Sequence, residues 1–135
     1  MADHAPLNDK DYRMLTKRAA YTKGLNAESL VAQKLQDMGW QIKGTRYKTK
    51  FGEVDLIAEN LDTVSFIEVK ARKKVNEGLI SLTKRSQKRI IAAARVWLSQ
   101  YNDISMKTIR FDLAVVCGNR CYLYENYFQD DADFF

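Results

Sequence analysis

Apolar residues recur along the chain with two different periods, and these periods predict its secondary structure. Between residues 25 and 38 they return at steps of three and four, which predicts an amphipathic helix that Gly39 ends. The same spacing between residues 83 and 101 predicts a second helix, with Ser81 or Thr83 as its N-cap. Each predicted helix therefore has one apolar face to bury against the rest of the chain.

Shorter stretches that alternate in polarity or are continuously apolar predict five strands. These are residues 40–48, 53–59, 63–70, 109–117 and 120–124. Asn60-Leu61-Asp62 and Gly118-Asn119 are turn sequences that join two pairs of strands as hairpins. Both faces of 63–70 are apolar at its start, which predicts a central strand. The order helix, three strands, helix, two strands predicts an α/β domain with a mixed sheet between helices.

The length and composition fit a single domain of this kind. The chain has 135 residues, of which 46% are hydrophobic, enough for one core. We expect the domain to span 22–128, after a tail (1–21) with room for a short helix near 12–20, and before an acidic tail (129–135). The sequence shows neither a membrane-spanning apolar run nor a signal-peptide pattern, and it has two cysteines. These features predict a cytoplasmic protein without a membrane partner.

Charge is distributed unevenly along the chain. There are 22 Lys and Arg against 17 Asp and Glu, a formal net charge of +5. Nine basic residues and one acidic residue lie between 70 and 95, whereas 125–135 holds four acidic residues and no basic one. Such a basic cluster suits nucleic acid, because each neutralised phosphate releases counterions. An ordinary solvated basic surface is the alternative.

Two apolar strands each carry charged residues that need a reason to be there. Asp55 lies in the middle of 53–59, and Glu68 and Lys70 share one face of 63–70. If these strands pair about the turn between them, the numbers of opposite residues sum to 122–124, which puts Asp55 near Glu68. Two carboxylates beside an ammonium group suit phosphodiester hydrolysis with Mg²⁺. A plain ion pair between Glu68 and Lys70 is the alternative.

The scarcity of other reactive residues narrows the chemistry. The single histidine, His4, argues against zinc sites built from several His and against most Ser-His or Cys-His catalysis. Cys117 and Cys121 have neither a neighbouring His nor a second Cys pair, so we expect small buried side chains rather than zinc ligands.

Several motifs follow one another in a fixed order between residues 24 and 128. They are Gly24-Leu25-Asn26-Ala27-Glu28, Met38-Gly39-Trp40, Gly52-Glu53-Val54-Asp55-Leu56-Ile57-Ala58, Phe66-Ile67-Glu68-Val69-Lys70-Ala71-Arg72, Ala93-Ala94-Arg95-Val96-Trp97-Leu98, Arg110-Phe111-Asp112 and Asn126-Tyr127-Phe128. This set resembles the YraN family of bacterial endonuclease-like proteins, in the PD-(D/E)XK or restriction-endonuclease-like superfamily with the Holliday junction resolvases of archaea. The resemblance implies a restriction-endonuclease-like three-layer α-β-α fold with a mixed central sheet.

The resemblance also implies roles for four residues. Asp55, Glu68 and Lys70 match the catalytic positions of the superfamily, and Glu28 matches an additional acidic position that completes the metal site of resolvase-like members. Asp55, Glu68 and Glu28 are thus the implied ligands of Mg²⁺ or Mn²⁺. The implied activity is hydrolysis of duplex or branched DNA in repair or recombination. The alternative is a non-catalytic nucleic-acid-binding accessory module. Whether the protein forms a homodimer stays open.

Basic residues around this candidate site are expected to contact DNA phosphates. The candidates are Arg46, Lys48, Arg72, Lys73, Lys74, Lys84, Lys88 and Arg89. We expect Glu53, Arg110 and Asp112 to support the site. For Arg110 and Asp112, a structural ion pair is the first expectation. The acidic tail is expected to be a frayed end, or alternatively a cover that competes with DNA for the basic surface.

Overall fold

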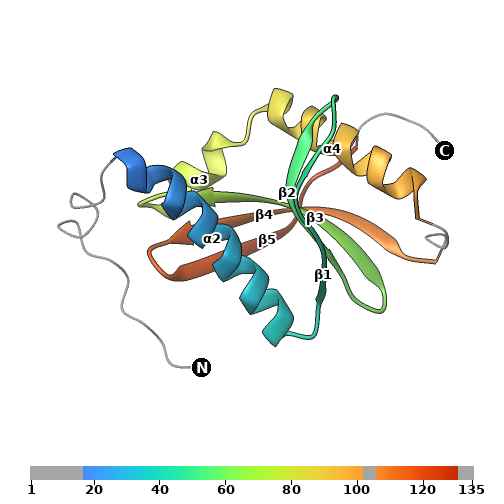
Figure 1. The fold of residues 1–135 in the computed structure, drawn as a ribbon, viewed down its shortest axis with the longest axis horizontal. Coiled ribbons are helices and arrows are strands. Elements are labelled where there is room, and N and C mark those ends of the chain that lie inside the picture. Colours follow the sequence, from blue (N-terminus) through green and yellow to red (C-terminus); the bar gives the residue numbers. More distant parts are fainter. Residues whose placement is uncertain (1–16, 102–105, 131–135) are drawn as a thin grey trace.

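A mixed five-stranded sheet forms the middle layer of the molecule, with helices on both of its faces (Figure 1). The computed structural model describes residues 17–101 and 106–130, and side chains from residue 26 onward. In chain order the elements are α2 (Lys17–Asp37), β1 (Gln41–Lys48), β2 (Glu53–Glu59), β3 (Thr63–Ala71), α3 (Val75–Ser81), α4 (Lys84–Ser99), β4 (Thr108–Cys117) and β5 (Arg120–Phe128). The predicted three-layer α-β-α class with a mixed sheet is confirmed.

The strands lie in the order β1-β2-β3-β4-β5, so β3 is central as predicted. β3 and β4 run parallel, and the other neighbours are antiparallel. The numbers of opposite residues in β2 and β3 sum to 123, as for Leu56 and Ile67. This is the register that the turn sequence predicts. The parallel pair needs a long crossover, and α3 and α4 supply it on one side of the sheet.

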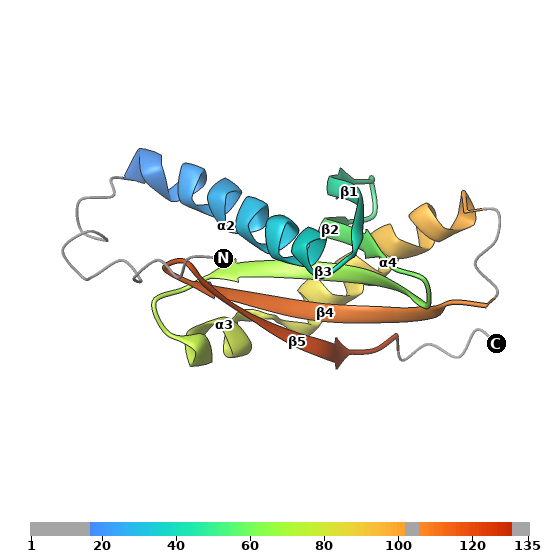
Figure 2. The ribbon, with the colours of Figure 1, turned by 90° about the horizontal axis from the view of Figure 1, so that it is seen from below.

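Two apolar clusters fill the spaces between the layers, and Figure 2 shows α2 and α3 on opposite sides of the sheet. α2 packs through Ala27, Val31 and Leu35 against one face of the sheet. α4 packs through four buried residues against the other, where Phe66 stands edge-on to Trp97 with ring centroids 5.8 Å apart. This second cluster also contains Val54. Strict alternation along β2 would instead place Val54 with Leu56, on the side of α2.

The two long helices end and begin at the residues that the sequence singles out. α2 closes with a Schellman motif at Gly39 (φ +93°), where Gly39 N–H donates to Gln36 and Trp40 N–H donates to Leu35, each at 3.0 Å. α4 begins after Thr83, whose Oγ1 accepts from Ser86 N–H at 3.1 Å. α2 already starts at Lys17, inside the predicted tail, and the rest of that tail lies outside the described residues.

The helix α3 corrects the predicted element order. It has only seven residues, too few for a helical period of apolar residues to be recognised in the sequence, and it follows β3 directly. It packs closely because Gly78 lies against Val115, where a Cβ would come within 2.6 Å of the valine side chain. The order is therefore one helix, three strands, two helices and two strands.

The strand β5 is longer than predicted because a bulge interrupts its pattern. Leu113 pairs with Tyr124, and Phe111 pairs with Phe128, so three residues of β5 oppose one residue of β4. Asn126 has φ +54° in this bulge, and alternation resumes only beyond it. The sequence pattern therefore ends at residue 124, whereas the pairing continues to Phe128.

The two cysteines face opposite sides of the sheet. Cys117 packs against the cluster under α4, and Cys121 packs against the cluster under α2. Both are half-buried, and burial raises the pKa of the Cys121 thiol. In the part of the chain that the structure describes, none of the helices is long and apolar enough to cross a membrane.

Candidate functional site

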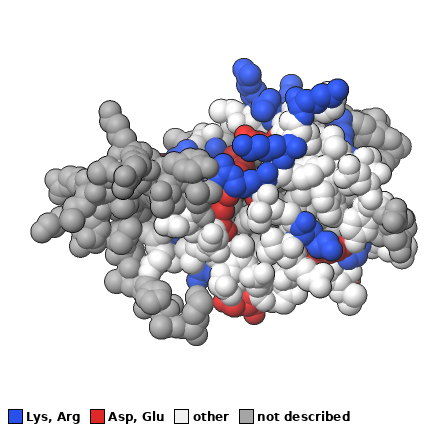
Figure 3. Space-filling model, in the orientation of Figure 1, with Lys and Arg blue, Asp and Glu red and all other residues white. Residues whose placement is uncertain are grey.

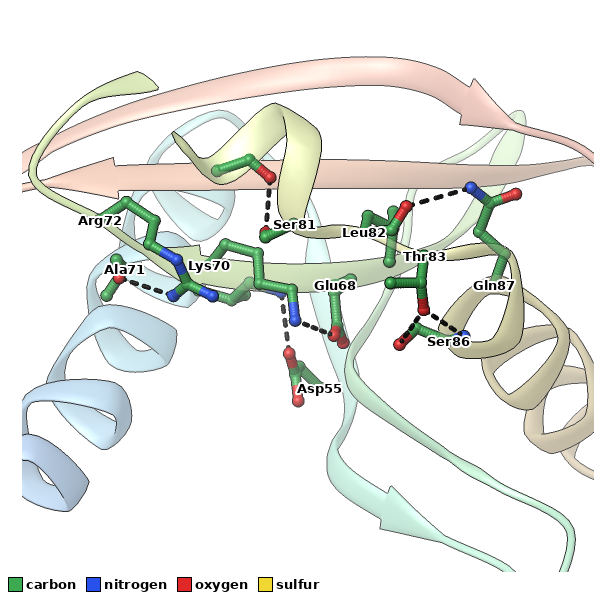
Figure 4. Close-up of polar contacts among 12 residues, drawn as sticks. Asp55, Glu68, Lys70, Ala71, Arg72, Ser81, Leu82, Thr83, Ser86 and Gln87 are labelled. Carbon is green, nitrogen blue, oxygen red and sulfur yellow. Dashed lines mark hydrogen bonds and ion pairs between the residues drawn. The ribbon is translucent and has the colours of Figure 1, made fainter. Parts of the chain in front are cut away.

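The strands β2 and β3 separate at the point where their charged residues begin. Their regular pairing ends at Leu56 and Ile67, and the next residue of β2 is Asp55. There the carboxylate Oδ2 of Asp55 accepts the backbone N–H of Val69 at 2.8 Å (Figure 4). This bond fixes the Asp55 side chain between the two strands, on the side that faces α4.

Glu68 and Lys70 point to the same region from β3, as Figure 4 shows. Lys70 Nζ lies 3.1 Å from Glu68 Oε2, and their side chains are only 19% and 15% exposed. The contact that was expected under the alternative of a plain ion pair is thus present. It occurs beside Asp55, so two acidic groups and one ammonium group meet where the strands part.

The electrostatics of this group favour an additional cation. The pKa of Glu68 is raised to about 8, first by burial and then by the charge and hydrogen bonding of Asp55, whereas Lys70 lowers it only in part. At neutral pH the site therefore prefers to hold a proton on Glu68. A metal ion bound between the carboxylates would supply the missing positive charge.

A pocket of about 200 Å³ opens beside the carboxylates. Residues from β1, β2, β3 and α4 line it, namely Arg46, Glu53, Asp55, Glu68, Ser86, Arg89 and Ile90. Its lining is mostly charged or polar, with acidic groups on the sheet and a guanidinium group on either side. The arrangement can accept a cation and an anionic group together.

Gly52 brings the β1–β2 hairpin directly against α4, and both of these elements line the pocket. A Cβ at this position would lie 2.0 Å from the backbone oxygen of Arg89, which leaves room for glycine alone. Thr49 holds the turn, because its Oγ1 accepts from the N–H groups of Phe51 and Gly52, each at 3.1 Å. Arg46, on the incoming strand, has φ +50°.

Glu28 on α2 influences the site without lining the pocket. Its pKa is raised, first by partial burial, then by the charge of Asp55, with a smaller contribution from Glu53, whereas Arg46 lowers it. Glu53 does line the pocket, beside Asp55. The structure therefore brings Glu53 to the pocket wall, and Glu28 within electrostatic range of Asp55.

The candidate phosphate-binding residues fall into two groups. Arg46 and Arg89 line the pocket, while Lys84 and Lys88 line a separate groove of about 260 Å³ on α4 with Gln129 and Asp130. The structure does not place Lys48, Arg72, Lys73 or Lys74 in the described lining of either. Figure 3 shows Lys and Arg side chains gathered over the β1–β2 hairpin and the start of α4, with acidic side chains next to them.

Arg110 and Asp112 lie on the other face of the sheet, toward α2, and form the expected ion pair. Arg110 Nε is 3.0 Å from Asp112 Oδ1. The fully buried Asp112 also accepts from Ser65 Oγ at 2.5 Å and from Asn126 N–H at 2.8 Å. Asp112 therefore holds the bulge of β5 to β4, and it supports the sheet rather than touching the pocket.

Sequence reasoning missed Ser86 and the neighbouring Ile90 as pocket residues. Their signal was present, since Ser86 lies one turn before Arg89 and would share its face of the helix. The acidic end of the chain was expected to be a frayed tail, or alternatively a cover of the basic surface. Its first part does touch α4, because Asp130 pairs with Arg95 at 2.9 Å, and residues 131–135 lie outside the described part.

The acidic side chains at the pocket determine which metal it can accept. Among the described residues, no three His, Cys, Asp or Glu side chains form a ready-made metal site. Asp55 and Glu68 provide two carboxylates, and Mg²⁺ is commonly bound through one or two carboxylates plus substrate phosphate. The residues therefore fit a metal whose remaining ligands are water and substrate.

The model of the uncharacterised protein family UPF0102, which is the YraN family, matches residues 27–116. A UPF0102 protein of Rhodopseudomonas palustris is 41% identical over 106 residues, which cover 78% of this chain and 82% of that protein. A UPF0102 protein of Mesorhizobium japonicum is 41% identical over 101 residues, 75% of this chain and 81% of its own length. One from Brucella canis is 39% identical over 104 residues, 77% of this chain and 82% of its own length.

Proposed function

This chain belongs to the uncharacterised protein family UPF0102, and we propose that it is a metal-dependent endonuclease that hydrolyses phosphodiester bonds in DNA. One observation carries the proposal: Asp55 and Glu68 converge from neighbouring strands beside Lys70, on a pocket that Arg46 and Arg89 flank. The acidic centre suits a metal, and the surrounding guanidinium groups suit phosphates.

The metal in this proposal is Mg²⁺ or Mn²⁺, with Asp55 and Glu68 as its ligands and Glu28 as a nearby acidic group. Such an ion makes a bound water more acidic and neutralises charge on the phosphate. Glu68 must lose its proton to act as a ligand, so its raised pKa links metal binding to proton release.

The protein's own groups position the reacting atoms. Lys70, held at 3.1 Å by Glu68, orients the attacking water or stabilises the negative charge that develops on the phosphate. The water oxygen bonds to phosphorus as the bond to the leaving sugar oxygen breaks. One water proton stays on the new phosphate, and the other is transferred to the leaving oxygen.

The basic residues define where the DNA lies. Arg46 and Arg89 contact phosphates at the pocket, and Lys84 and Lys88 extend the contact along α4. Lys48, Arg72, Lys73 and Lys74 remain candidates for contacts farther from the cut. DNA as substrate implies action in the cytoplasm, and repair or recombination intermediates with branches are the substrates that the family resemblance favours.

A cleavage screen tests this function. The full chain is incubated with linear duplex, single-stranded, branched DNA and RNA, in Mg²⁺ or Mn²⁺, beside Asp55→Asn and Glu68→Ala. We expect metal-dependent cleavage of at least one DNA substrate and a loss of at least about 100-fold in each variant, because each removes a carboxylate ligand. Asp62→Asn, at the far end of the β2–β3 hairpin, is the matched control and should cleave like the wild type.

Thermal unfolding gives a second readout that does not depend on finding the substrate. Mn²⁺ should raise the melting temperature of the wild type, because a ligand that binds only the folded state stabilises it. Asp55→Asn should lose this response. An unchanged melting temperature together with wild-type behaviour of Asp55→Asn would refute the nuclease.

A second candidate is a DNA-binding module without catalysis. It is favoured by the absence, among the described residues, of a group of three or more metal-ligating side chains. In that case Lys70 and Glu68 form a structural ion pair. Binding of DNA without cleavage in either metal, and without any effect of Asp55→Asn, would identify this function.

A further inference from the structure

A large aromatic side chain is exposed at the tip of the β1–β2 hairpin. Phe51 is 56% exposed, although an apolar ring of this size is usually covered. Lys50 Nζ lies 5.2 Å from the centre of the ring and leaves much of it open to solvent. The ring is therefore available to a flat partner.

The turn that carries Phe51 is held rigidly. Thr49 Oγ1 accepts from the N–H groups of Phe51 and Gly52 and donates to Gly52 O at 2.9 Å. On its other side Gly52 is pressed against the backbone of Arg89 on α4. The backbone that carries the ring is therefore held in place, so this segment loses little backbone entropy when the ring binds a partner.

The position of the turn relates Phe51 to the candidate pocket. The two strands of this hairpin provide three pocket residues, Arg46 from β1 and Glu53 and Asp55 from β2. Phe51 lies two residues before β2 begins, so its backbone is at most about 13 Å from that of Asp55, at about 3.3 Å per residue. This is about four steps of a nucleic-acid strand, at about 3.4 Å each.

We propose that Phe51 stacks on an unpaired base of the nucleic acid whose backbone lies over the Asp55 pocket. Aromatic rings stack on exposed base faces, which are available in single strands and at branches but not inside a continuous duplex. Lys48 and Lys50 on either side of Thr49 provide positive charge for the adjacent phosphates. Phe51 thus makes the protein prefer DNA with unpaired bases. The inference rests on the proposed function only in its choice of a nucleic-acid ligand.

Equilibrium binding in EDTA tests the inference without any cleavage. Fluorescence anisotropy is measured with a labelled single-stranded oligothymidine, a fork with one unpaired arm and a blunt duplex. Phe51→Ala should weaken binding of the single strand and the fork by about 5- to 100-fold, the usual worth of stacking one base. Duplex affinity should change less than twofold. Phe51→Trp should restore binding, and its fluorescence should be quenched more than that of the wild type when oligothymidine is added.

Leu61→Ala is the matched control, because Leu61 is 88% exposed on the turn at the other end of the sheet, between β2 and β3. It should bind all three ligands like the wild type. Equal losses on the single strand and the duplex, no loss in Phe51→Ala, or no binding of any ligand by the wild type would overturn the inference. The proposed function fails separately, if the wild type binds these ligands but no metal supports cleavage.

Discussion

The carboxyl group of Glu68 lies in an environment that opposes its ionisation. Burial and the nearby Asp55 both raise the pKa of the Glu68 carboxyl, and Lys70 at 3.1 Å only partly offsets them. The neutral form therefore prevails at neutral pH in the metal-free protein. In the proposed reaction, a metal must displace this proton before both carboxylates can act as ligands.

The raised pKa of Glu68 predicts how stability depends on pH. The unfolded chain releases the proton near its ordinary pKa of 4.5, whereas the folded protein holds it to about 8. The stabilising contribution of this group is therefore complete below pH 4.5 and is lost as the pH rises through 8. Glu68→Gln cannot ionise, so its unfolding free energy relative to the wild type should rise by at least about 1 kcal/mol between pH 5 and pH 8. Urea denaturation at several pH values measures it.

Glu125→Gln is the control for this experiment, because Glu125 is 60% exposed and far less confined than Glu68. Its stability relative to the wild type should stay nearly constant across the same pH range. A parallel pH dependence of Glu68→Gln and the wild type would show that Glu68 is ionised in the folded protein at neutral pH.

At the residue scale, the sequence predicts the acidic part of the site better than the basic part. Asp55, Glu68 and Lys70 interrupt apolar strands, and the turn at residues 60–62 fixes which of them are opposite. No such constraint applies to the basic residues, because a lysine or arginine is tolerated at any exposed position. Only the fold determines that Arg46 and Arg89 reach the pocket.

At the scale of elements, the contact between the β1–β2 hairpin and α4 controls the shape of the pocket. The hairpin provides Arg46, Glu53 and Asp55, and the helix provides Arg89. Gly52 is the point where the two touch, and the space available there ends at the Arg89 backbone oxygen. A movement of one element relative to the other would therefore separate the acidic residues from the basic one.

Gly52→Ala should disrupt this contact. Its Cβ would lie 2.0 Å from the Arg89 oxygen, a backbone atom that cannot move without its helix. We expect destabilisation by about 1–3 kcal/mol, typical of overpacking, together with weaker DNA binding. Chemical denaturation and anisotropy measure the two effects.

Gly44→Ala provides the comparison, since its Cβ would meet only the end of the Ile57 side chain, at 3.2 Å. That methyl group can shift, so we expect a smaller loss of stability and wild-type DNA binding. Similar losses in both variants would mean that the hairpin is not held by the Gly52 contact.

Elements with a full hydrophobic period could be predicted, and those defined by tertiary contacts could not. The central strands and the cores of α2 and α4 agree with their patterns because burial on one or two faces dictates the residues. The helix α3 depends on Gly78 fitting against Val115, and the end of β5 depends on a bond from Asn126 to Asp112. Neither contact leaves a periodic signal in the sequence.

For the whole molecule, the net charge of +5 hides an opposition between its parts. The groove on α4 is lined by Lys84, Lys88 and Arg95, which would attract phosphates. Asp130 lies in the same groove and pairs with Arg95 through both carboxylate oxygens, each at 2.9 Å. Its negative charge occupies a position that a phosphate could take.

Asp130→Asn should therefore increase DNA affinity. We expect about a two- to fivefold gain at low salt, the worth of one exposed ion pair, and a smaller gain at high salt because of screening. Binding of a duplex over a range of salt concentrations measures it. Glu77→Gln, an exposed residue on α3, removes the same charge elsewhere. An equal gain in both variants would indicate a general effect of net charge rather than competition in the groove.

The order of the elements along the chain also determines the order in which the site can be completed. The hairpin of β2 and β3 involves neighbours in sequence, and its Asp55 and Glu68 can meet as soon as it closes. Thr63, in contrast, pairs with Thr108, which follows both α3 and α4 in the sequence. In a chain emerging from the ribosome, Asp55 and Glu68 appear before Arg89, which lies on α4. Under the proposed function, the cation site of the newly made protein is therefore complete before its DNA-binding surface.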